Sequence, residues 1–63
     1  MWIITKDGVA INMEYVSKLY YRENTTMAKV DGQTTIIATG NMIQPILGAL
    51  KNMETTIDFR EGL

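Results

Sequence analysis

Apolar and polar residues alternate in short runs along the first two thirds of the chain, and two Asp-Gly dipeptides interrupt these runs. Asp7-Gly8 and Asp31-Gly32 each lie between segments rich in β-branched side chains. A two-residue hairpin turn of the primed type needs positive φ at its centre, which glycine adopts freely and aspartate tolerates. The pattern therefore predicts two β-hairpins with these dipeptides at their tips.

The first tip also predicts which residues of the first hairpin face each other. A turn centred on Asp7-Gly8 places Ile4 opposite Ile11. The same register places Trp2 opposite Met13, on the same apolar side of the hairpin. We therefore expect Trp2 to lie in the core.

The second tip, Asp31-Gly32, predicts the register of the second hairpin in the same way. The expected pairs are Val30 with Gln33, Ala28 with Thr35, and Thr26 with Ile37. Both sides of this hairpin carry apolar residues, whereas a sheet with one solvated side alternates more sharply. We expect each side to be covered by another element or by another molecule.

The segment between the hairpins, Tyr15 to Arg22, is dense in side chains that favour strands. It predicts a third strand with apolar residues on both of its sides. Asn12-Met13-Glu14 would turn the chain into this strand, and Glu23-Asn24 would turn the chain out of it.

After Ala38 the hydrophobic period changes from two to about 3.6, which predicts one amphipathic helix. Its apolar stripe consists of Ile43, Ile46, Leu47 and Leu50, extended by Met42 and Met53. Asn41 can cap the first turn, and Gln44 stands in the capping-box position three residues later. Gly48 lowers helix propensity, so either the helix packs closely against another element at this point or the cost is tolerated; we favour close packing.

The last segment, Thr55 to Arg60, alternates again and places Ile57 and Phe59 on one side. It is expected to form an edge strand, either in this chain or in the sheet of a second copy. The predicted fold class is α+β, in a single domain that spans residues 1–63. It has a small antiparallel sheet of two hairpins plus a middle strand, one amphipathic helix on one face and the C-terminal edge strand.

A family resemblance rests on the spacing of these elements. The chain has an apolar start, a first hairpin at Lys6-Asp7-Gly8, the segment Ala10 to Val16, a second hairpin at Val30 to Gln33, and then a helix. This arrangement resembles the small flagellar FlbD-like proteins and similar short proteins of bacteria and their phages. The resemblance covers about the first fifty residues. It implies a compact accessory protein without catalysis and identifies no functional residue.

Composition narrows the chemistry. The 63 residues include no cysteine and no histidine, which excludes disulfides and thiolate or imidazole zinc sites. Ser17 is the only serine and has no neighbouring base signature, and the acidic residues are scattered. We therefore expect no catalytic residue, no metal site, no cofactor and no enzymatic activity. No apolar run is long enough for a bilayer span and no secretory signal is visible, so we expect a cytoplasmic protein, in the host cytoplasm if a phage encodes it.

Size and side-chain content favour an interaction module. A domain this short hides only about 60% of the surface of its unfolded chain, which favours stabilisation by a partner. Aromatic and methionine side chains are enriched at the centres of protein interfaces. The candidate contact residues are Tyr20, Tyr21, Arg22, Met27 and Phe59. The first hypothesis is a homo-oligomer, most simply a dimer, whose sheet or edge strand forms the subunit contact. It would also bind another protein, as small accessory and inhibitor proteins of bacteria and phages do.

Two alternatives remain open. The first is a protein that binds a small, nucleotide-like ligand at a subunit interface through Tyr20, Tyr21 or Arg22, because subunit junctions are favoured ligand sites. The second is a single-strand nucleic-acid binder, with Tyr20 or Tyr21 stacking on bases. The six basic residues are spread evenly along the sequence and are outnumbered by seven acidic ones, for a net charge of -1. Nucleic acid is therefore the least favoured partner.

Overall fold

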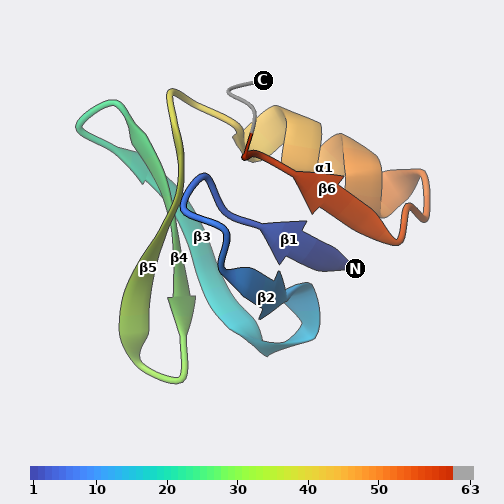
Figure 1. Ribbon diagram of the computed structural model, residues 1–63, viewed down its shortest axis with the longest axis horizontal. Coiled ribbons are helices and arrows are strands. Elements are labelled where there is room, and N and C mark those ends of the chain that lie inside the picture. The colour runs from blue at the N-terminus through green and yellow to red at the C-terminus, as the bar shows by residue number, and fades with distance from the viewer. Residues whose placement is uncertain (61–63) are drawn as a thin grey trace.

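The computed structural model describes residues 1–60, which form two three-stranded β-sheets and one α-helix (Figure 1). The elements in chain order are β1 (Trp2–Ile4), β2 (Ala10–Asn12), the 3₁₀ helix η1 (Met13–Tyr15), β3 (Val16–Arg22), β4 (Thr25–Val30), β5 (Gln33–Thr39), α1 (Ile43–Lys51) and β6 (Thr56–Asp58). The predicted α+β class with hairpins and a single helix is confirmed. The strands, however, divide between two sheets instead of forming one.

Strands β3, β4 and β5 form an antiparallel sheet with tight turns at both connections. Asp31 and Gly32 have φ values of 51° and 81°, and both residues of Glu23-Asn24 also have positive φ, as primed turns require. The predicted pairs of Val30 with Gln33 and of Ala28 with Thr35 are confirmed. The expected pair of Thr26 with Ile37 is wrong, because a bulge shifts the register so that Thr26 faces Ala38.

Strands β2, β1 and β6 form the other sheet, in that order. The C-terminal strand β6 pairs with β1 of the same chain, in parallel. Ile3 on β1 lies opposite Ile11 on β2 and Ile57 on β6, so that three isoleucines cross this sheet in one row. The 3₁₀ helix η1 connects β2 of this sheet to β3 of the other sheet. The Asn12 side chain caps η1 by accepting a hydrogen bond from the Glu14 N–H at 3.0 Å. Tyr15 therefore lies in η1 and not in the predicted strand.

The predicted register of the first hairpin is wrong by one residue. Its loop has three residues, Lys6-Asp7-Gly8, closed by a bond from the Gly8 N–H to the Thr5 carbonyl at 2.9 Å. Ile4 therefore pairs with Ala10, and Ile3 pairs with Ile11. A shift of one residue exchanges the two sides of a strand. Trp2 is consequently exposed and lies outside the core.

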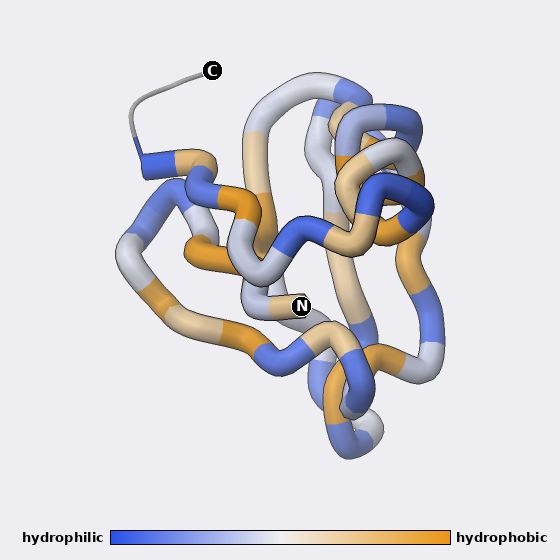
Figure 2. Tube along the Cα trace, turned by 90° about the vertical axis from the view of Figure 1, so that its right-hand side faces the viewer, coloured by the Kyte–Doolittle hydropathy of each residue, from blue (hydrophilic) through white to orange (hydrophobic). Residues whose placement is uncertain are grey.

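The core lies between the two sheets and the helix. Strands β1, β2 and β6 and helix α1 all lie on the same side of the β3–β4–β5 sheet (Figure 1). The buried cluster draws on both sheets and the helix and consists of Ile3, Ala28, Ile37, Ala38, Ile46 and Phe59. Hydrophobic and hydrophilic stretches alternate along residues 1–60, as expected for elements that each bury one side (Figure 2). The opposite side of the β3–β4–β5 sheet has no covering element among residues 1–60.

The helix buries a narrower stripe than its sequence predicts. Ile46 and Ala49 are buried, whereas Leu47 and Leu50 are exposed. The Asn41 side chain accepts a hydrogen bond from the Ile43 N–H at 3.2 Å, but no side chain caps the helix at its N-cap residue. Within residues 1–60 no helix combines the length and the apolar character needed to cross a membrane.

Thr26 on the central strand β4 forms hydrogen bonds with the loop between β5 and α1. Its side chain is fully buried. The hydroxyl donates to the Gly40 carbonyl at 2.6 Å and accepts from the Met42 N–H at 2.8 Å. One side chain therefore satisfies two backbone groups at the start of the helix.

Replacing this hydroxyl with a methyl group should destabilise the fold. Thr26→Val keeps the shape of the side chain but leaves the Gly40 carbonyl and the Met42 N–H without this partner. We expect a loss of about 1 to 3 kcal/mol in the free energy of unfolding, measured by urea denaturation. Thr26→Ser, which keeps the hydroxyl, should lose less, and an equal loss in both variants would contradict the role of the two bonds.

Gly48 offers a substitution that should stabilise the helix. A Cβ atom at Gly48 would have no neighbour within 4 Å, so the expected close contact at this position is absent. Gly48→Ala should therefore raise the free energy of unfolding by up to about 1 kcal/mol, because alanine is the better helix former. Gly32→Ala is the matched control and should destabilise the chain, since φ at Gly32 is +81°. A destabilised Gly48→Ala variant would contradict the prediction.

Candidate interaction surface

The uncovered side of the β3–β4–β5 sheet presents a defined set of side chains. Side chains on a strand alternate between its two sides. On β4, the buried Thr26 and Ala28 face the core, so Met27 and Lys29 face the other way. The strand register then assigns Tyr20 to the same outer side, because Tyr20 lies opposite Met27.

An apolar row crosses the middle of this outer side. Tyr20 on β3, Met27 on β4 and Ile36 on β5 lie opposite one another in the two strand pairings. Ile36 remains 45% exposed, and the other two are partly exposed. The row therefore offers aromatic, thioether and aliphatic groups side by side on one rigid sheet.

Basic side chains flank the apolar row. Lys18 and Lys29 lie directly opposite each other on one flank, and Arg22 lies on the other flank, opposite Thr25. The Lys18 ammonium group lies 4.9 Å from the centre of the Tyr20 ring, within range of a cation–π interaction. We name this surface the basic sheet face; it consists of Lys18, Tyr20, Arg22, Met27, Lys29 and Ile36.

The basic sheet face is free of acidic side chains of its own. None of the strands β3, β4 and β5 contains aspartate or glutamate. Glu23 and Asp31 lie in the turns at opposite ends of the sheet. Lys6 adds a further positive charge at the margin, because its ammonium group donates to the Thr39 hydroxyl at 3.4 Å. Half of the six basic residues of a chain with net charge -1 therefore project from one acid-free surface.

The structure unites three of the five residues that the sequence suggested as contacts. Tyr20, Arg22 and Met27 share the basic sheet face. Tyr21 lies opposite the buried Thr26, on the core side of the sheet, but is exposed near the end of β3. Phe59 is only 3% exposed and belongs to the core cluster, so its side chain is not available to a partner.

Three further residues of this face, Lys18, Lys29 and Ile36, did not appear among the suggested contacts. Spacing along the sequence does not bring them together, because they come from three different strands. The signal that could have found them is the absence of acidic residues from the segments between the turns, combined with the register set by Asp31-Gly32.

One of the remaining basic residues is already engaged near the C-terminal end of the described chain. The Arg60 guanidinium group forms an ion pair with Asp58 at 2.7 Å. The side-chain hydrogen bonds from Arg60, followed by a bond from its backbone N–H, hold the pKa of Asp58 below its usual value. Both groups are exposed, so this pair is a local contact at the end of β6.

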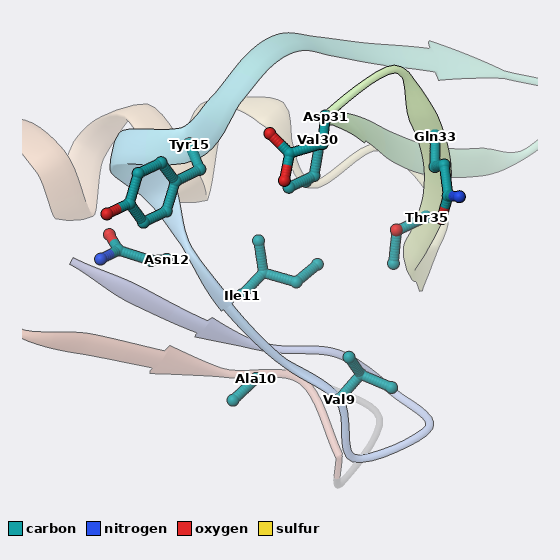
Figure 3. A pocket seen from close by; sticks show the side chains of 9 residues that line it. All are labelled: Val9, Ala10, Ile11, Asn12, Tyr15, Val30, Asp31, Gln33 and Thr35. Carbon is teal, nitrogen blue, oxygen red and sulfur yellow. The ribbon is translucent and has the colours of Figure 1, made fainter.

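A shallow hollow of about 430 Å³ lies elsewhere on the molecule. It is bounded on one side by β2 and η1 and on the other by the tip of the β4–β5 hairpin (Figure 3). Ile11 projects between these walls toward Val30, while Tyr15 and Asp31 stand at the rim (Figure 3). The residues that line it are Val9, Ala10, Ile11, Asn12, Tyr15, Val30, Asp31, Gln33 and Thr35.

The hollow lies apart from the residues that the sequence suggested as ligand contacts at a subunit interface. Its lining includes none of Tyr20, Tyr21 and Arg22. Its single charged side chain is the carboxylate of Asp31, which would repel a phosphate group. Within residues 1–60, no three acidic side chains come together in a way that could hold a metal ion.

A second exposed apolar feature lies on the helix. Leu47, Leu50 and Met53 are exposed, and Met53 is 87% accessible just after the end of α1. We name these three residues the helix stripe. The helix stripe carries no charge of its own, in contrast to the basic sheet face.

Comparisons with protein-family models, curated proteins and solved structures find no match to this chain. The resemblance to FlbD-like proteins therefore stays a prediction. Function has to be argued from the surfaces of the molecule itself.

Proposed function

We propose that this chain is a small, non-catalytic interaction module that binds another protein through the basic sheet face. The observation that carries the proposal is the apolar row of Tyr20, Met27 and Ile36 between basic flanks. Protein interfaces have this anatomy, with apolar and aromatic groups at the centre and polar groups at the rim. Tyrosine and arginine are also the side chains most often found at interface hot spots.

The position of this surface in the fold supports the proposal. The β3–β4–β5 sheet is covered on its other side by β1, β2, β6 and α1 (Figure 1). Contact residues on the middle of a packed sheet are held in place before a partner arrives, which lowers the entropic cost of binding. An accessory role of this kind is also what the resemblance to FlbD-like proteins implies.

Selection of peptides from a random displayed library tests the binding surface without a known partner. Peptides recovered on the wild-type chain should lose binding to a Tyr20→Thr, Ile36→Thr double variant by about tenfold or more, because the variant lacks two thirds of the apolar row. Threonine keeps strand propensity, so the sheet itself should form. Peptide affinities measured by fluorescence polarisation give the comparison.

The matched control for this selection is Leu47→Gln, which changes an exposed apolar residue away from the sheet. The selected peptides should bind this variant as tightly as they bind the wild-type chain. Folding of each variant is checked by the dispersion of its amide resonances. Peptides that bind the double variant and the wild-type chain equally would overturn the assignment of the surface.

The proposed self-association is better placed on the helix stripe than on the sheet. A twofold contact needs a surface that is complementary to itself. Two copies of the basic sheet face would place Lys18, Arg22 and Lys29 against like charges, which is unfavourable. The helix stripe carries no such charges.

Sedimentation velocity at micromolar concentration tests this placement. We expect the wild-type chain to sediment as a dimer and the Leu47→Glu, Leu50→Glu variant as a monomer, since four buried carboxylates would oppose the contact. The Tyr20→Thr, Ile36→Thr variant should stay dimeric. A monomeric wild-type chain would contradict self-association. If the Tyr20→Thr, Ile36→Thr variant were monomeric, the subunit contact would lie on the sheet and not on the helix stripe.

A further inference from the structure

We infer that the partner of the basic sheet face is an acidic amphipathic helix of another protein. This inference rests on the proposed function and adds to it the chemistry and the shape of the partner. Three features of the face carry the inference. They are an unfavourable pair of lysines, the spacing of the apolar row, and the presence of positive charge on both sides of that row.

The lysine pair indicates that the partner is anionic. Lys18 and Lys29 are directly opposite each other on adjacent antiparallel strands. Like charges in this position destabilise a sheet, whereas opposite charges stabilise it. Both side chains are exposed, and strands β3, β4 and β5 contain no acidic residue. Asp31 lies in the adjoining turn, two residues after Lys29, but forms no ion pair with either lysine within the described residues. A carboxylate supplied by a partner would remove this repulsion.

The apolar row fits a helix that lies across the strands. Tyr20, Met27 and Ile36 belong to three neighbouring strands, so the row extends over two strand spacings, or about 10 Å. One turn of an α-helix rises about 5.4 Å, which is close to one strand spacing. Apolar side chains on successive turns of a helix would therefore meet the three members of the row in order.

The flanks of the row define where the partner carries its acidic residues. Lys18 and Lys29 lie on one side of the row, and Arg22 lies on the other side. Lys6 extends the flank that contains Arg22. Its ammonium group donates to Thr39 on β5. Thr25 on β4 pairs with Arg22 on one side and with Thr39 on the other, so the two cations lie on the same flank. A helix with glutamates on both sides of its apolar stripe would meet a cation on each side.

Single-stranded nucleic acid fits the same face less well. Binding platforms for single strands stack successive bases on aromatic rings. The row contains one aromatic residue, Tyr20, and the Lys18 ammonium group already lies near its ring. Met27 and Ile36 provide apolar contact but no stacking surface, which favours the apolar side chains of a protein.

The test uses the full ¹⁵N-labelled chain and a synthetic helical peptide with leucines at positions i, i+4 and i+7, flanked on both sides by glutamates. Addition of this peptide should shift the amide resonances of β3, β4 and β5 and leave those of α1 unchanged. Binding should weaken as salt is added, because surface charges are screened. A peptide with lysines in place of the glutamates should not bind.

Lys29→Glu separates a binding role from a structural one. It places opposite charges across the strand pair, so the unbound chain should melt at a higher temperature than the wild type. The same change should weaken binding of the acidic peptide by about tenfold or more. Lys51→Glu, which reverses a charge on the helix, should leave the peptide affinity unchanged. Arg22→Gln provides a second variant on the opposite flank and should also weaken binding.

The outcomes distinguish this inference from the proposed function. Peptides selected from the random library that need Tyr20 and Ile36 but are not enriched in acidic residues would overturn the acidic partner and leave the interaction module standing. A failure to select any peptide that depends on these two residues would overturn the interaction module itself. The chain could instead bind oligothymidylate more tightly than the acidic peptide and lose this binding in the Lys29→Glu variant. That result would overturn the acidic helix and identify single-stranded nucleic acid as the partner.

Discussion

The buried hydroxyl group of Thr26 sets the position of helix α1 against the β3–β4–β5 sheet, and the rest of the arrangement depends on that position. It joins the central strand β4 to the loop that leads into α1, through bonds to Gly40 and Met42. Because Thr26 is fully buried, a shift of this loop would break both bonds and leave the hydroxyl without partners. The start of α1 is thereby fixed, and Ile46 is directed into the core between the sheets and the helix.

The same strand that anchors the core also carries the centre of the candidate surface. Along β4, the core residues Thr26 and Ala28 alternate with the outward residues Met27 and Lys29. Because the two sets share one backbone, the packing that holds the inner side chains also fixes the outer ones. The apolar row is therefore positioned by the fold and needs no loop to order when a partner binds.

Much of the fold could be predicted from turn chemistry, and the errors have the same origin. Asp31-Gly32 specified the turn of the second hairpin and its register as far as the bulge between Met27 and Thr26, because a two-residue primed turn leaves one pairing next to it. Asp7-Gly8 is the same dipeptide, but it forms part of a three-residue loop. The longer loop shifts the register by one residue, which places Trp2 on the exposed side of its strand. Buried Thr5 accounts for the longer loop, since its hydroxyl accepts from the Val9 N–H at 3.0 Å. The burial of Thr5 depends on how the rest of the chain packs around it, and local sequence does not reveal it.

The surface was less predictable than the fold because net charge is an average over all sides of a molecule. A chain with six basic and seven acidic residues has almost no net charge, and this argued against nucleic acid as the partner. Strands β3, β4 and β5 contain no acidic residue, and their register brings Lys18, Arg22 and Lys29 together on one side of the sheet. At physiological salt, charges act over a distance of about 8 Å, so a partner at the middle of this face responds to these cations, and to Glu23 and Asp31 in the adjoining turns, more than to the acidic residues on other elements. Charge should therefore be counted along each side of each predicted strand before a class of partner is excluded.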